Sequence, residues 1–155
     1  MRTLPPAAVS TDTAEHEAFH RVVADAFERH HEDHPDYADM FLVYGPSGYV
    51  VFSHARSAAL GTALKRGAYA NTNLSRCWNQ VLRTEAPALV DFGFYPGVDE
   101  PVALLGVPLF DAQERIQGML AGMLTSDTIT RIVQQGRDLS ETGEMHLVGQ
   151  DLLMR

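Results

Sequence analysis

Two histidines and a glutamate near the N-terminus have the spacing of a zinc-dependent hydrolase. His16-Glu17-Ala18-Phe19-His20 matches the pattern H-E-x-x-H, in which the two histidines share one helix face and the glutamate activates water. A catalytic zinc also needs a third protein ligand and a cleft around the helix. No later segment of the sequence clearly supplies both. The motif therefore supports zinc hydrolysis only as an alternative function.

A second histidine group follows. His30, His31 and His34 lie beside Glu32 and Asp33, and could bind a divalent metal ion adventitiously. A polar helix end explains the same residues, and we favour that interpretation. The sequence contains no Ser-His-Asp order, P-loop, paired catalytic carboxylates or Rossmann fingerprint. We therefore predict no catalytic residues, no resident metal and no cofactor.

Polar and aromatic residues further along the chain could instead line a pocket for a small molecule. The candidates are Tyr44, His54, Arg56, Tyr69, Asp91, Tyr95 and Met119. Asp91, Gly93 and Tyr95 alternate along a predicted strand and should share one face. A buried aspartate is costly unless it is paired or hydrogen-bonded, so Asp91 has an equally good alternative role in a structural pair with Arg56.

Three other residues have both a core and a functional interpretation. Trp78 is expected to anchor the core rather than stack on a ligand, and Cys77 to be a small buried residue rather than a nucleophile. Met119 is expected in the core, and its functional interpretation places it at the pocket floor.

The elements that must position these residues follow from hydrophobic spacing. An apolar stripe at three- and four-residue intervals predicts a helix from about 13 to 31 that stops before Pro35. Its stripe could pack on a second copy of the chain. Further helices are predicted at 72–84 and from 126 to about 135, the last ended by Gly136. Strands are predicted at 39–44, 49–53, 88–95, 144–148 and, as a pair, within Pro101–Leu124. Residues 54–70 should form a loop.

The pair within Pro101–Leu124 should form the centre of the sheet. Gly106, Gly118 and Gly122 interrupt it, and glycine in a strand often marks the close approach of another group. The approaching group is either a packed helix or a ligand beneath the loop 54–70, and we favour the ligand.

Composition narrows the possible functions. The chain has 155 residues, 45% of them hydrophobic, a net charge of −8 and one cysteine. These values indicate one globular domain, 12–155, after an irregular lead-in of residues 1–11, with no disulfide. The acidic charge gathers in Asp12–Asp39, which we interpret as a solvated helix face, and gives no reason to expect a nucleic-acid partner. No stretch has the length of a membrane span or the form of a signal peptide.

Hairpins and a meander with helices between them indicate an α+β fold with an antiparallel sheet. Several stretches, from about residue 28 to the end, together resemble the extracytoplasmic Cache sensor domains of bacterial chemoreceptors, histidine kinases and nucleotide cyclases, which have a PAS-like fold. They are DMFLVYGPSGYVVFS (39–53), LGTALKRGAY (60–69), LVDFGFYP (89–96), LLGVPLFD (104–111), IQGMLA (116–121) and LSETGEMHLVGQDLLMR (139–155).

The resemblance implies a five-stranded antiparallel sheet, a homodimer packed through the long N-terminal helix, and a small-ligand pocket closed by the loop and helix between strands two and three. It also implies a periplasmic domain of a membrane-anchored receptor, from which this chain would be an excised piece. The amino-acid-binding members carry a Trp-Tyr pair, whereas Asn79 follows Trp78 here, so amino-acid binding is not predicted. A ligand-free PAS-like dimerisation module remains a further alternative.

Overall fold

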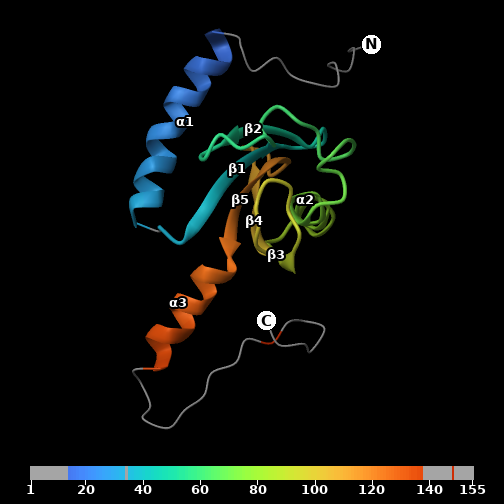
Figure 1. The fold of residues 1–155 in the computed structure, drawn as a ribbon. Coiled ribbons are helices and arrows are strands. Elements are labelled where there is room, and N and C mark those ends of the chain that lie inside the picture. Colours follow the sequence, from blue (N-terminus) through green and yellow to red (C-terminus); the bar gives the residue numbers. More distant parts are fainter. Residues whose placement is uncertain (1–13, 34, 138–147, 149–155) are drawn as a thin grey trace.

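Five antiparallel strands form a single sheet in the order β2-β1-β5-β4-β3 (Figure 1). The computed structural model describes residues 14–33, 35–137 and 148 of the chain. The strands are β1 (Tyr37–Tyr44), β2 (Tyr49–Ser53), β3 (Ala88–Gly93), β4 (Val102–Phe110) and β5 (Ile116–Thr125), and the helices are α1 (Ala14–Asp33), α2 (Asn73–Thr84) and α3 (Ser126–Arg137). The predicted α+β fold with a five-stranded antiparallel sheet is confirmed.

The hairpin formed by β4 and β5 places β5 at the centre of the sheet, as the sequence predicted. The chain returns from β4 to β5 and then lays β5 along β1, so that Val43 faces Met119 and Phe41 faces Ala121. Side chains alternate between the two faces of a strand. These four residues therefore share one face of the sheet, and all four are buried there.

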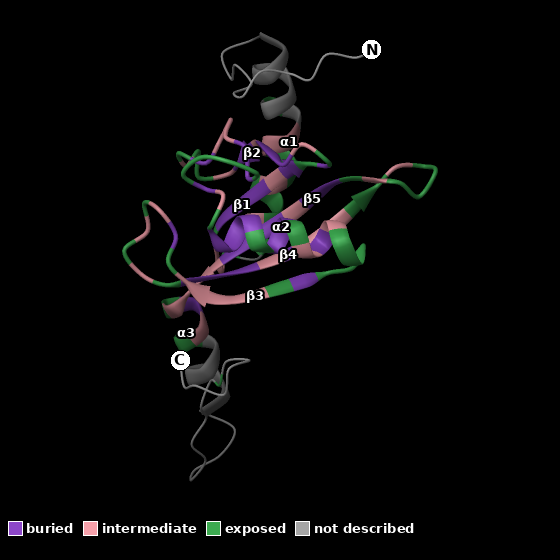
Figure 2. Ribbon diagram, turned by 90° about the vertical axis from the view of Figure 1, so that its right-hand side faces the viewer, coloured by how far each residue is buried: buried purple, intermediate pink, exposed green. Residues whose placement is uncertain are grey.

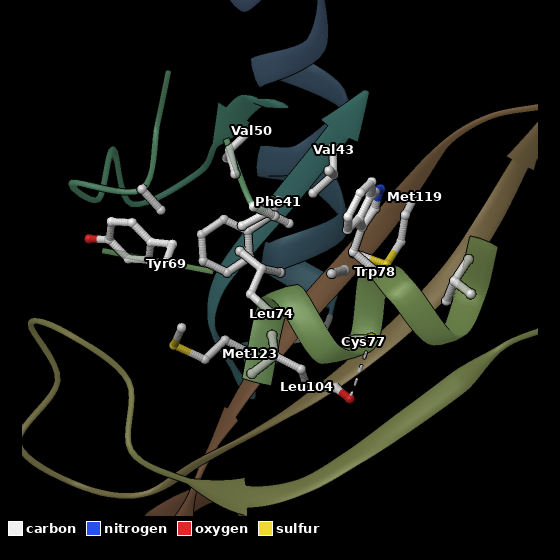
Figure 3. Close-up of a cluster of buried hydrophobic side chains, with 14 of the residues drawn as sticks. Phe41, Val43, Val50, Tyr69, Leu74, Cys77, Trp78, Leu104, Met119 and Met123 are labelled. Atoms are coloured by element: carbon white, nitrogen blue, oxygen red, sulfur yellow. Dashed lines mark hydrogen bonds between the residues drawn. The ribbon is translucent and has the colours of Figure 1, made fainter. Parts of the chain in front are cut away.

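Helix α2 covers that face and completes the core (Figure 3). Thr72 caps the helix by accepting a hydrogen bond from the backbone N–H of Ser75 (3.4 Å). From the helix, Cys77 and Trp78 are both almost fully buried, as predicted. Burial raises the pKa of the Cys77 thiol to about 12, so the side chain behaves as a small apolar residue.

Helix α1 lies on the other side of the sheet from α2 (Figure 1). It ends before Pro35, as predicted, and the Phe27 ring packs on Phe52 of β2 with centroids 4.5 Å apart. Burial colouring in Figure 2 shows the core concentrated between the sheet and α2. Among the described residues, no helix is both long and apolar enough to cross a membrane.

Several element boundaries differ from the prediction, among them the ends of α3 and β3. Helix α3 continues through Gly136 to Arg137, because a glycine weakens a helix by about 1 kcal/mol without breaking its hydrogen bonds. Strand β3 ends at Gly93 rather than Tyr95, since the register with β4 shifts between Val90 and Gly93. The predicted strand 144–148 lies outside the described residues except for Val148.

The glycines of β4 and β5 make room for protein groups, which corrects our expectation of a ligand beneath them. A Cβ atom on Gly106 would lie 2.5 Å from Cys77 Sγ of α2. One on Gly118 would lie 2.5 Å from the Val43 carbonyl oxygen, and one on Gly122 would meet the Tyr37 ring. The groups that approach these three glycines closely are thus a helix, a neighbouring strand and an aromatic ring.

We expect Gly106→Ala to lower the free energy of unfolding by about 1–3 kcal/mol, because the added methyl overpacks the contact with α2. Urea denaturation of the variant measures this loss. Shortening the opposing side chain gives the matched control: Gly106→Ala with Cys77→Ala should lose less stability than the two single changes summed. Additive losses would contradict this packing.

Candidate ligand-binding site

A cavity of about 380 Å³ opens in the loop between β2 and α2. Its walls are formed by Gly61, Thr62, Ala63, Arg66, Gly67, Ala68 and Tyr69. The volume falls in the lower part of the range for small-molecule sites. Of the predicted pocket residues, Tyr69 alone is among these wall residues.

Backbone hydrogen bonds hold the loop against β2 like a short additional strand. Val50 N–H donates to the Thr62 carbonyl (3.0 Å), Gly61 N–H donates to the Val50 carbonyl (2.8 Å), and Leu64 N–H donates to the Gly48 carbonyl (2.9 Å). Gly61 has a φ of +76°, a conformation that glycine adopts without strain. The sheet therefore supports the cavity wall directly.

The ring of Tyr69 packs against that of a second tyrosine, Tyr95, whose hydroxyl has no partner among the described residues. The ring centroids of Tyr69 and Tyr95 are 5.6 Å apart, and those of Phe41 and Tyr95 are 6.2 Å apart. Tyr95 is 1% exposed, and its hydroxyl has no hydrogen-bond partner among the described residues. Burial, Tyr69 and Asp39 raise its pKa, so the hydroxyl stays protonated. In Figure 3, Tyr69 lies at the edge of the core with its hydroxyl turned away from it.

A buried carboxylate also lies on β1, on the same face of the strand as Phe41. Asp39 is 4% exposed and, from the described residues, accepts three hydrogen bonds: from Met40 N–H (2.7 Å), Ala55 N–H (2.9 Å) and Ser53 Oγ (2.8 Å). The interpretation of Asp12–Asp39 as a solvated face is therefore wrong at its last residue. Asp39 points inward because it precedes Phe41 by two positions on the same strand.

The other predicted residues are separated from the cavity. Tyr44 is 53% exposed and, being next to the buried Val43, points to the sheet face opposite α2. Met119 is fully buried in the core cluster. The Asp91 side chain accepts from Phe92 N–H (2.8 Å), and the end of β3 breaks the predicted alternation with Tyr95.

His54 and Arg56 open the loop as predicted, but His54 faces α1. Its ring centroid lies 4.8 Å from that of His31, and its Nε2 lies 3.9 Å from Glu28 Oε2. Arg56 is exposed, with a φ of +53°. The structure thus brings Tyr69 and Tyr95 together, and it places His54 at a junction between the loop and α1.

Sequence reasoning missed Asp39 as a candidate, together with its partner Ser53. The only signal was an acidic residue at the start of an apolar strand, D-M-F-L-V-Y, with a serine ending the returning strand. The acidic residues before it masked that signal.

The side chains of His16, Glu17 and His20 lie outside the described residues. Within the described part of the chain, no three histidine, cysteine or acidic side chains are grouped to hold a metal ion.

Comparison with known proteins identifies solved structures that have a similar fold. No protein-family model and no curated protein matches the chain. A solved extracellular ligand-binding receptor from Desulfohalobium retbaense is similar to it, with a TM-score of 0.57 and 14% identity over 72% of this chain. The ligand-binding domain of the Pseudomonas aeruginosa amino-acid chemoreceptor PctC, in complex with GABA, has a TM-score of 0.56 and 19% identity over 92% of this chain.

The chain shares the fold of these two structures. It spans 19% of the first structure and 57% of the second, so it corresponds to part of each. The fold expected from the Cache resemblance is confirmed. No finding supports the zinc hydrolase alternative.

Proposed function

We propose that this chain is a small-ligand sensor domain of a bacterial transmembrane signalling receptor, and that it has no enzymatic activity of its own. The observation that carries the proposal is the cavity in the loop between β2 and α2, because the similar solved structures are ligand-binding domains. In the parent protein the domain would lie in the periplasm, anchored to the inner membrane and paired with a second copy through α1.

The contacts of the loop suggest how binding would be transmitted. Asp39 and His54 attach the start of the loop to β1 and to α1 respectively. A ligand that prefers one arrangement of the loop would shift the population of α1 positions, in proportion to its differential affinity for the two states.

A thermal-shift screen of small acids, amines and metal ions tests this function. A ligand at 100 times its Kd should stabilise the domain by about 2.7 kcal/mol, which raises Tm by several degrees. Ala68→Trp should abolish the shift by filling the cavity. Ala58→Trp, an exposed position of the same loop that is not among the cavity walls, is the matched control and should leave the shift intact. Equal shifts in both variants would show that the ligand binds elsewhere.

A further inference from the structure

We propose that the ligand of the cavity between β2 and α2 is an uncharged, mainly apolar molecule, such as a short-chain alcohol. This inference rests on the proposed function and names the chemical class of ligand for the same site. It follows from the side chains and the backbone groups that form the walls of the cavity.

The side chains of the walls are mostly small and apolar. The wall residues without a polar side-chain atom are Gly61, Ala63, Gly67 and Ala68. Thr62 has a hydroxyl, but this hydroxyl donates to the Ala59 carbonyl at 2.6 Å. Walls of this kind can remove hydrocarbon from water, which is favourable, whereas a charged group would lose its hydration there without gaining a partner.

The backbone of the walls is engaged in hydrogen bonds within the protein. Gly61 N–H and the Thr62 carbonyl are both paired with Val50 of β2, at 2.8 and 3.0 Å. The Ala63 carbonyl accepts from Arg66 N–H at 3.3 Å. A strongly polar ligand would give up its hydrogen bonds to water and would compete with these internal bonds, which is unfavourable.

Arg66 is the charged residue of the described walls, and it is exposed. An arginine can pack the apolar stem of its side chain against a ligand while its charge stays in water. Ion pairs at exposed positions are weak, so Arg66 should improve the binding of an anion by no more than about fivefold.

Tyr69 is the aromatic residue of the walls. It is buried, and this burial raises the pKa of its hydroxyl, as expected in surroundings that are poor in water. Its ring adds a large apolar surface to the small side chains around the cavity. The cavity is therefore suited to a hydrocarbon chain.

A series of straight-chain alcohols tests this ligand class in thermal-shift titrations up to about 10 mM, above the ~1 mM Kd of a weak ligand. We expect 1-butanol, 1-pentanol and 1-hexanol to raise Tm, with a Kd that falls about fourfold for each added methylene, as burial of that group predicts. Hexanoate and hexylammonium have the chain length of 1-hexanol and carry opposite charges. Neither should bind more than about fivefold more tightly than 1-hexanol.

Two variants that introduce a charge locate the binding. Ala68→Asp places a carboxylate on the cavity wall and should weaken the affinity for 1-hexanol at least about tenfold, because the alkyl chain would displace water from the charge. Ala58→Asp, on the same loop but not among the cavity walls, is the matched control and should leave the affinity unchanged. Both positions are exposed, so both variants should fold.

The inference is overturned if no alcohol raises Tm, or if the affinity does not rise with chain length. It is also overturned if either charged compound binds more than about fivefold more tightly than 1-hexanol, or if both variants bind 1-hexanol equally well. If the alcohols fail but another compound of the broader screen binds and is lost in Ala68→Trp, the sensor function stands without this ligand class. If no compound is lost in Ala68→Trp, the cavity is not the sensor site. The two failures are therefore distinguishable.

Discussion

Replacing Trp78 with alanine should lower the free energy of unfolding by about 3–5 kcal/mol, the range for removing a large buried aromatic side chain. Trp78 is 1% exposed, and its Nε1 donates to the Gly45 carbonyl at 3.1 Å. Gly48, with a φ of +70°, brings the same turn so close that a Cβ would lie 2.9 Å from the indole ring. Trp78 thus fixes the β1–β2 turn to α2. Natural domains have about 5–15 kcal/mol of stability, so the loss is a large fraction of the total.

Far-UV circular dichroism during urea denaturation is the appropriate measurement, because Trp78 is the only tryptophan and its fluorescence disappears in the variant. Trp78→Phe should lose less, since it retains a ring but not the hydrogen bond. Arg76→Ala, at an exposed position of the same helix, is the control and should change stability by no more than about 0.5 kcal/mol. A Trp78→Ala variant as stable as Arg76→Ala would show that the indole does not hold the turn.

Most helices and strands could be predicted because turn residues, helix caps and hydrophobic spacing indicate the same elements. The G-P-S-G link between two apolar runs marks the first hairpin, and Thr72 marks the start of α2. The sheet order, in which β5 separates β1 from β4, depends on contacts distant in sequence. The sequence indicated only that the β4–β5 pair lies at the centre of the sheet, and it left the order of the other strands open.

The candidate site was harder to predict because burial and partner choice are set by tertiary structure. The structure brings the rings of Tyr69 and Tyr95 together, whereas Tyr44, at the end of β1, is 53% exposed and is not part of the cavity wall. The end of β3 illustrates this dependence on tertiary structure. There the Asn73 side chain donates to the Asp91 and Val102 carbonyls (2.9 and 2.8 Å), at the point where the β3–β4 register shifts. A side chain 18 residues away from Asp91 thus interrupts the strand that the sequence predicted to continue to Tyr95.

Replacing Asp39 with alanine should lower the free energy of unfolding by about 3–4 kcal/mol, because one substitution leaves three donors without their acceptor. Met40 N–H and Ala55 N–H would both lose Asp39 Oδ1, and the Ser53 hydroxyl would lose Oδ2. Ser53 Oγ also accepts from Ser57 N–H at 2.9 Å, so the loss should extend into the loop that forms the cavity.

Two comparisons separate the hydrogen bonds of Asp39 from its charge. Asp39→Asn keeps an oxygen that can accept from the two backbone groups, and we expect it to lose about 1–2 kcal/mol. Asp99→Ala removes an exposed carboxylate and should change stability by no more than about 0.5 kcal/mol. Urea denaturation at neutral pH measures all three variants. If Asp39→Ala is as stable as Asp99→Ala, then the carboxylate does not hold the loop. If instead Asp39→Asn is nearly as stable as the native protein, the negative charge is not needed for folding.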